Sequence, residues 1–172
     1  MADVTIKKHP KGGYLLRSES LVERPIDEVF AFFADAANLE RLTPPWLKFE
    51  ILTPTPIDMQ PGRLIDYRLR IRGVPVRWQS EITLWDPPHA FADESRRGPY
   101  KYWVHNHRFE SVDGGTRVVD EAHYDVPGGA LVHRLVVKRD VQKIFEYRQR
   151  QLAELFPPRL ATADVLLRAG AG

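Results

Sequence analysis

The sequence predicts an α+β fold in which a curved antiparallel sheet of about six or seven strands wraps around one long C-terminal helix. Three observations carry this prediction. Apolar and polar side chains alternate with a period of two through most of residues 47–126. Short turns rich in glycine and proline interrupt the alternation, as expected of an antiparallel meander. From Gly129 onward the apolar spacing becomes that of a helix of roughly seven turns.

The segment before the sheet predicts one strand and two short helices. Residues 14–24 form a long run that ends at Pro25, and we interpret this run as the first strand. Pro25 suits a first helical turn, and Asp27 and Glu28 suit the positively polarised end of a helix. The apolar residues that follow at helical spacing are Val29, Phe32 and Phe33. We expect two short helices after the first strand, with a break near residues 35–38.

The central part of the chain predicts the meander. After Leu64, residues 65–72 alternate, with the apolar side chains on one parity and aspartate and arginine on the other. Turn signals separate such runs, for example "GVP" before residue 76 and "VDGGT" before residue 117. The expected strands cover residues 47–53, 64–72, 76–88, 89–98, 98–109 and 117–126.

The last part of the chain predicts the long helix that covers the sheet. Residues 130–156 are amphipathic, and Pro157 and Pro158 end the pattern. The apolar residues expected near one stripe of this helix are Leu131, Leu135, Val141, Ile144, Phe145, Leu152 and Leu155. We expect a single domain at residues 1–156 and a tail at residues 157–172.

Composition excludes several classes of function. The 172-residue chain has no cysteine, which excludes disulfides, a thiolate nucleophile and a cysteine-based zinc site. Its formal net charge of +2 is too small to predict a nucleic-acid partner. The first 14 residues lack the apolar stretch of a signal peptide, and no run approaches the roughly 20 apolar residues of a membrane span. We therefore expect a cytoplasmic protein without an integral membrane segment. The sequence is compatible with a homodimer.

The order of elements resembles the helix-grip fold of the SRPBCC or START-like superfamily, which includes the birch-pollen allergens. The resemblance covers residues 13–156. Its local motifs are "SLVERPIDEVFAFFADAANLERLTPPW" at 20–46, "WDPPHAFADESRRGPYKYWVHNHRFE" at 85–110 and "GGTRVVDEAHYDVPGG" at 114–129. The last two are similar to a bacterial branch of polyketide cyclase/dehydrase-like or ligand-binding proteins.

The resemblance implies a cavity between the curved sheet and the long helix, and a small, mainly hydrophobic ligand inside it. A lipid, an isoprenoid, a quinone or an aromatic polyketide would fit this description. Two alternatives remain open. One is a cyclase/dehydratase-like enzyme that uses a histidine–aspartate pair in the cavity. The other is a protein-interaction module with a filled core.

The stretch "GPYKYWVHNHRF" at 98–109 holds the candidate site. His105 and His107 alternate with Trp103 and Phe109, so all four side chains share one face of a strand. We expect that face to point inward.

Asp120 is expected to face inward as well, since it lies between Val118 and Tyr124 in the same parity. A buried, unpaired carboxylate would cost several kcal/mol, so Asp120 needs a partner, and an inward histidine is a natural one. Asp93 shares the parity of Phe91 and is a further inward candidate. This cluster could line a cavity, form a structural network, or perform acid/base chemistry with His105 or His107 as the base.

A metal site is a further alternative for this cluster, because His-x-His with a carboxylate is a pattern of metal sites. No third histidine is evidently placed, so the sequence assigns no metal and no cofactor. The remaining histidines, His9, His89, His123 and His133, are expected in loops or facing outward. We expect the ligand to contact Tyr67, Trp78, Asp93, Trp103, His105, His107, Phe109, Asp120, Tyr124, Val141 and Phe145.

Overall fold

The backbone forms one antiparallel sheet of eight strands. The computed structural model describes residues 4–158. Its strands are β1 (Thr5–Lys8), β2 (Tyr14–Val22), β3 (Glu50–Ile51), β4 (Leu64–Ile71), β5 (Val74–Asp86), β6 (Ala90–Arg97), β7 (Tyr102–Val112) and β8 (Gly115–Asp125). They lie in the order β1-β2-β8-β7-β6-β5-β4-β3. All pairs join strands that follow each other in the chain, except that β2 pairs with β8 and so brings the start of the chain beside the last strand.

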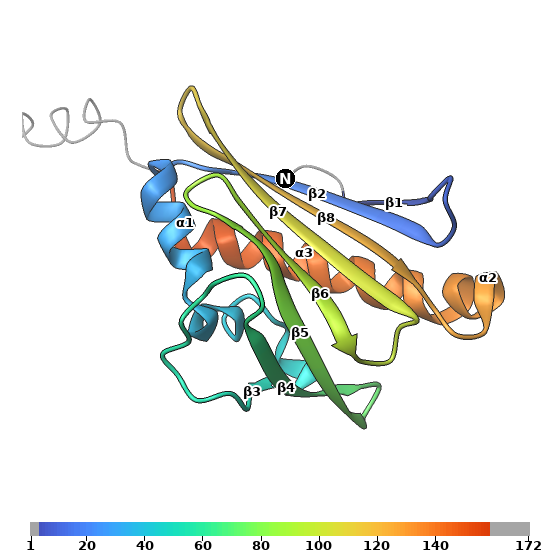
Figure 1. Cartoon of the computed structure of the whole chain (residues 1–172). Helices are drawn as coiled ribbons and strands as arrows, with labels where there is room; N and C mark the ends of the chain where they lie inside the picture. The colour runs from blue at the N-terminus through green and yellow to red at the C-terminus, as the bar shows by residue number, and fades with distance from the viewer. Residues whose placement is uncertain (1–3, 159–172) are drawn as a thin grey trace, which may run out of the picture.

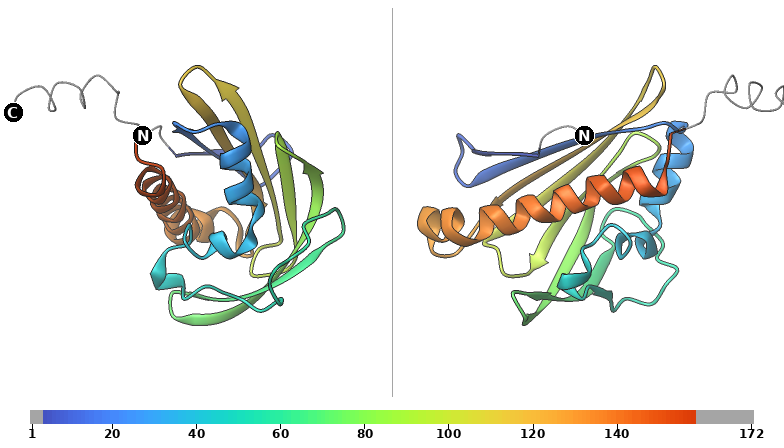
Figure 2. Two further views of the ribbon diagram at one scale, coloured as in Figure 1. Left: turned by 90° about the vertical axis from the view of Figure 1, so that its left-hand side faces the viewer. Right: turned by 180° about the vertical axis from the view of Figure 1, so that it is seen from behind.

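A long helix covers the concave face of this sheet. Helix α3 (Lys138–Leu155) runs diagonally behind the strands in Figure 1, and Figure 2 shows the sheet curving around it. Val141, Phe145 and Leu152 of α3 are buried against the sheet. The fold is therefore the expected α+β helix-grip arrangement.

The number of strands exceeds the expected six or seven because of β1. This strand pairs with β2, but its sequence, "TIKK", is short and mostly exposed. An edge strand of this kind shows no alternation of apolar and polar residues, so periodicity does not detect it. Conversely, the strand expected at residues 47–53 is reduced to the two residues of β3.

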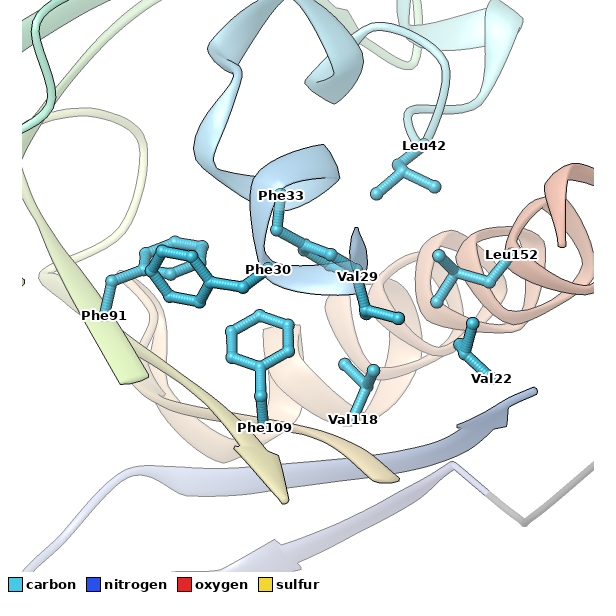
Figure 3. Close-up of a cluster of buried hydrophobic side chains, with 9 residues drawn as sticks. All are labelled: Val22, Val29, Phe30, Phe33, Leu42, Phe91, Phe109, Val118 and Leu152. Carbon is cyan, nitrogen blue, oxygen red and sulfur yellow. The ribbon is translucent and has the colours of Figure 1, made fainter. Parts of the chain in front are cut away.

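Two short helices follow the first long strand, as expected, but the break between them is confined to Asp35, and most of the break expected at residues 35–38 is occupied by the second helix. Helix α1 (Ile26–Ala34) begins directly after Pro25. The second helix is a 3₁₀ turn, η1 (Ala36–Leu39), whose start is capped by Asp35, since the Ala37 amide donates to its carboxylate at 3.0 Å. A further 3₁₀ turn, η2 (Pro45–Leu47), follows. Figure 3 shows Phe30 and Phe33 of α1 packed against Phe91 and Phe109 of the sheet.

The C-terminal helix is continuous but not uniform. Helix α2 (Gly129–Val132) passes through a π-helical segment, η3 (His133–Val137), into α3. A π turn is wider than an α turn and rotates the residues before it relative to those after it. Leu131 and Leu135, which were expected on the buried stripe, are accordingly 61% and 64% exposed.

The end of α3 at Leu155 agrees with the end expected near residue 156. Of the tail expected at 157–172, residues 159–172 lie outside the described residues. Within residues 4–158 no helix is both long enough and apolar enough to cross a membrane.

Candidate functional site

A cavity of about 650 Å³ lies between the sheet and α3. The curvature of the sheet holds its centre away from the helix, so the side chains of the two layers do not fill the space. Strands β4, β5 and β7 supply one wall, and α3 with η2 supplies the other. The lining residues include Leu47, Tyr67, Leu69, Trp78, Tyr100, Trp103, His105, Val141, Ile144, Phe145 and Arg148.

Three aromatic rings form a connected part of the wall. Trp78 packs edge-on against Tyr100 and Trp103, with ring centroids 5.5 and 5.8 Å apart. Tyr100 and Trp103 are 4.9 Å apart. Such contacts hold large rings in defined orientations, and this part of the wall is therefore preorganised for an apolar or aromatic body.

The buried polar cluster results from the register of three neighbouring strands. His105 on β7 lies opposite Asp93 on β6, and His107 on β7 lies opposite Asp120 on β8. Residues directly opposite in a sheet project to the same face. Two histidines and two aspartates therefore meet on the concave face, where Arg148 of α3 reaches them.

Asp120 is the centre of this cluster. Its Oδ1 lies 3.2 Å from His105 Nε2 and 2.7 Å from His107 Nδ1, and its Oδ2 lies 3.4 Å from Arg148 Nε. None of these contacts has hydrogen-bond geometry, so Asp120 Oδ1, both histidine nitrogens and Arg148 Nε are buried polar atoms without an aligned partner among the described residues. The cluster is held by charge and proximity.

Asp93 faces the other nitrogens of the same two histidines. Its Oδ2 lies 3.4 Å from His107 Nε2 and 4.0 Å from His105 Nδ1. Its Oδ1 accepts a hydrogen bond from the Ser80 hydroxyl at 3.2 Å. The Trp78 indole donates in turn to Ser80 Oγ at 3.1 Å, which connects Asp93 to the aromatic wall of the cavity.

The environment moves the pKa values of the two histidines apart. Burial and the neighbouring charge of His107 lower the pKa of His105 from 6.5 to about 4. Burial alone would also lower the pKa of His107, but its contacts with Asp120 and Asp93 raise it above 6.5.

The pKa values of the two carboxyls are low. Burial opposes ionisation of Asp93, but the hydrogen bond from His107 and the nearby histidine charges lower its pKa. For Asp120 the positive charge of Arg148, together with both histidines, overcomes burial and holds the pKa well below its usual value. Two carboxyls with lowered pKa values thus face one fixed cation, Arg148, and one histidine with a raised pKa, His107.

A second, smaller cavity of about 110 Å³ adjoins the cluster. Asp93, His107 and His105 line it together with Arg148 and apolar residues such as Phe33. His105 and Arg148 also line the larger cavity. The polar cluster therefore forms the wall that the two cavities share.

The structure brings together most, but not all, of the residues expected at the site. The larger cavity is lined by Tyr67, Trp78, Trp103, His105, Val141 and Phe145, and the smaller one by Asp93 and His107. Asp120 lies behind the histidines. Phe109 and Tyr124 line neither of these cavities: Phe109 packs against α1 (Figure 3), and Tyr124 packs near Leu16 and contacts His133.

Sequence reasoning missed Arg148, although a signal for it was present. Arg148 lies seven residues after Val141 and three after Phe145, on the same stripe of α3, and only 8% of it is exposed. His133 was expected to face outward but is buried. Its imidazole stacks on Tyr14 with ring centroids 3.3 Å apart, and its Nε2 lies 3.0 Å from the Tyr124 hydroxyl.

A protein family described as polyketide cyclase / dehydrase and lipid transport matches residues 22–152. A comparison with curated proteins gives no match.

Several solved structures share the fold. Protein Ms6760 from Mycobacterium smegmatis is 22% identical with a TM-score of 0.64, and the match covers 88% of this chain and 96% of that one. TTHA0849 from Thermus thermophilus is 25% identical with a TM-score of 0.59, covering 81% and 94%. Ara h 8.0201 is 19% identical with a TM-score of 0.59, covering 83% and 99%.

Proposed function

The chain belongs to the polyketide cyclase/dehydrase and lipid transport family, and on this premise we propose that it binds and carries a small, mainly hydrophobic ligand. The observation that carries the proposal is the cavity of about 650 Å³ between the sheet and α3. Pockets for small ligands usually have volumes of about 300–1,000 Å³ and mostly apolar walls. A lipid, an isoprenoid, a quinone or an aromatic polyketide is the expected class.

The walls suggest how such a ligand is oriented. An apolar or aromatic body would pack on Trp78, Trp103 and Phe145. A single polar group would point to His105 and Arg148, which are the buried polar side chains of the wall. A hydrogen bond to a buried charged group contributes about 1.5–3 kcal/mol, so this end would select ligands with a carbonyl or hydroxyl oxygen.

One alternative has a geometric observation in its favour. His105 lines the larger cavity and contacts Asp120, which is the arrangement that a cyclase/dehydratase using a histidine–aspartate pair would need. The open cavity argues against a protein-interaction module with a filled core. A cytoplasmic location, a homodimer and the lack of a nucleic-acid partner remain predictions.

A cavity-filling variant tests the proposal. Val141→Phe places a larger side chain in the cavity, whereas Leu84→Phe adds the same ring at an exposed position outside it. We expect the fluorescent apolar probe 1-anilinonaphthalene-8-sulfonate to bind the Val141 variant about tenfold more weakly, a loss of about 1.4 kcal/mol, and the Leu84 variant like the native chain. Circular dichroism checks that both variants fold.

Unchanged probe binding in a folded Val141→Phe variant would remove the proposal. If the Val141→Phe variant does lose affinity for the probe, native mass spectrometry of the chain purified from its own host identifies the natural ligand.

Incubation with a linear poly-β-ketone separates carriage from catalysis. A carrier returns the compound unchanged, and His105→Ala weakens its binding. An enzyme returns a cyclised or dehydrated product, and His105→Ala abolishes turnover while binding survives.

A further inference from the structure

We propose that Asp93, His105 and His107 form a binding site for a divalent transition-metal ion of the zinc or iron type at the wall between the two cavities. The site differs from the apolar ligand site, and its existence does not depend on ligand carriage.

The three side chains converge on one point. Each offers one ligand atom, and these atoms all lie within 4.8 Å of one another. Asp93 Oδ2 is 3.4 Å from His107 Nε2 and 4.0 Å from His105 Nδ1. Metal–ligand bonds of about 2.0–2.2 Å place neighbouring ligand atoms roughly 3.0–3.5 Å apart. The side chains would therefore need to move inward by no more than roughly 1 Å to hold an ion.

The remaining polar atom of each of the three residues faces a polar group outside the site. The second nitrogen of each histidine, His105 Nε2 and His107 Nδ1, faces Asp120 Oδ1 at 3.2 and 2.7 Å. The second oxygen of Asp93 accepts from Ser80 at 3.2 Å. Carboxylate partners of this kind orient metal-bound histidines and fix which nitrogen carries the proton. With the outer nitrogens turned to Asp120, His105 Nδ1 presents a lone pair to the site, and His107 Nε2 does so once it gives up the proton that it shares with Asp93.

The carboxylate and the two imidazole nitrogens at this site also favour a bound cation. In this structure the proton between His107 Nε2 and Asp93 supplies the positive charge at the site, and a metal ion that displaces this proton would take its place among the inner nitrogens and the carboxylate. Among the described side chains of this cluster, Arg148 is the only fixed cation, and its ion pair is with Asp120.

The surroundings leave room for an open coordination position. The three ligands line the smaller cavity of about 110 Å³, which has space for a few waters at about 30 Å³ each. Two nitrogens and one oxygen suit zinc or iron(II), whereas magnesium and calcium prefer oxygen ligands alone. Because His105 also lines the larger cavity, an ion here would lie beside the polar end of a bound ligand.

The test uses the full chain, with any affinity tag removed and metals stripped by a chelator. The stripped chain is titrated with Co²⁺, whose binding is measured by its visible d–d absorption. A second titration with Zn²⁺ is measured by calorimetry, and Mg²⁺ serves as the control ion. We expect one Co²⁺ or Zn²⁺ per chain and no Mg²⁺. His105→Gln and the nearly isosteric Asp93→Asn should abolish the signal. Asp120→Asn should weaken binding by about 10- to 100-fold, as outer-shell changes do.

The matched control is His89→Gln, which removes an exposed histidine that is not part of the cluster and should leave binding unchanged. Thermal unfolding without metal checks that each variant is folded. A native chain that binds neither Co²⁺ nor Zn²⁺ would overturn the proposal, as would binding that survives in folded Asp93→Asn and His105→Gln. Probe binding measured on the same samples reports on the apolar cavity separately, so the two proposals can fail independently.

Discussion

Arg148 is the residue on which the buried charges most depend. It is the cation that contacts Asp120, and both side chains are nearly inaccessible. Removing one partner of a buried ion pair leaves an uncompensated charge and typically costs about 3–5 kcal/mol. We expect Arg148→Met to lower the free energy of unfolding by about that amount in urea titrations.

Arg150 provides the control for this prediction. It lies two residues further along α3 and is exposed. Arg150→Met should change the free energy of unfolding by less than about 0.5 kcal/mol, as most surface substitutions do. Equal effects of the two substitutions would show that the contact of Arg148 with Asp120 does not stabilise the fold.

The alternation of apolar and polar residues predicts which face of the sheet a side chain points to. It does not predict which helix covers that position along the strand. Parity alone indicated that His105, His107 and Asp120 share the inner face, and the register of β7 and β8 then brings them into contact. Phe109 and Tyr124 have the same parities as these residues but lie further along their strands. There α1 and η3 fill the space beneath the sheet. A period of two carries no information about which helix covers which part of a strand.

The π-helical segment η3 within the long helix was not predictable from the sequence. "HRLVV" contains no glycine or proline, and its residues are compatible with an ordinary α-helix. Tertiary contacts hold the segment instead, because His133 stacks on Tyr14 of β2 and contacts the hydroxyl of Tyr124 on β8. The long helix could be predicted from the sequence. The rotation of its buried face at the π turn could not.

The burial of His133 predicts a pH dependence of stability. Burial, with the nearby charge of Lys138, lowers the pKa of His133 below its ordinary value of 6.5. Below pH 6.5 the unfolded chain binds this proton more readily than the folded chain, so the contribution of neutral His133 falls as the pH decreases. The stability advantage of the native chain over His133→Gln should therefore shrink between pH 8 and pH 5. Urea titrations of both chains across this range provide the measurement, and parallel curves would contradict the prediction.

Besides the buried contact of Arg148 with Asp120, an exposed ion pair joins the sheet layer to α3 beside the cavity. Arg72, in the turn between β4 and β5, donates to Asp140 of α3 through Nε at 2.7 Å and Nη2 at 3.0 Å. Both residues line the larger cavity, and Arg72 is exposed. A ligand that enters beside this turn, between the sheet and the helix, would require the two layers to separate there. This contact therefore lies where it can slow that motion.

Releasing this ion pair should speed ligand exchange. Arg72 has a positive φ of 51°, so Arg72→Asn is the suitable variant, because asparagine tolerates the left-handed conformation. An exposed ion pair contributes about 0.2–1 kcal/mol, which corresponds to a rise of about 1.4- to 5-fold in the dissociation rate of 1-anilinonaphthalene-8-sulfonate. Stopped-flow displacement measures this rate. Arg68→Asn removes a similar exposed pair, with Glu50, away from the cavity, and should leave the rate unchanged. Equal rates in the native chain and the Arg72 variant would mean that the ligand leaves by a path that does not separate this turn from α3.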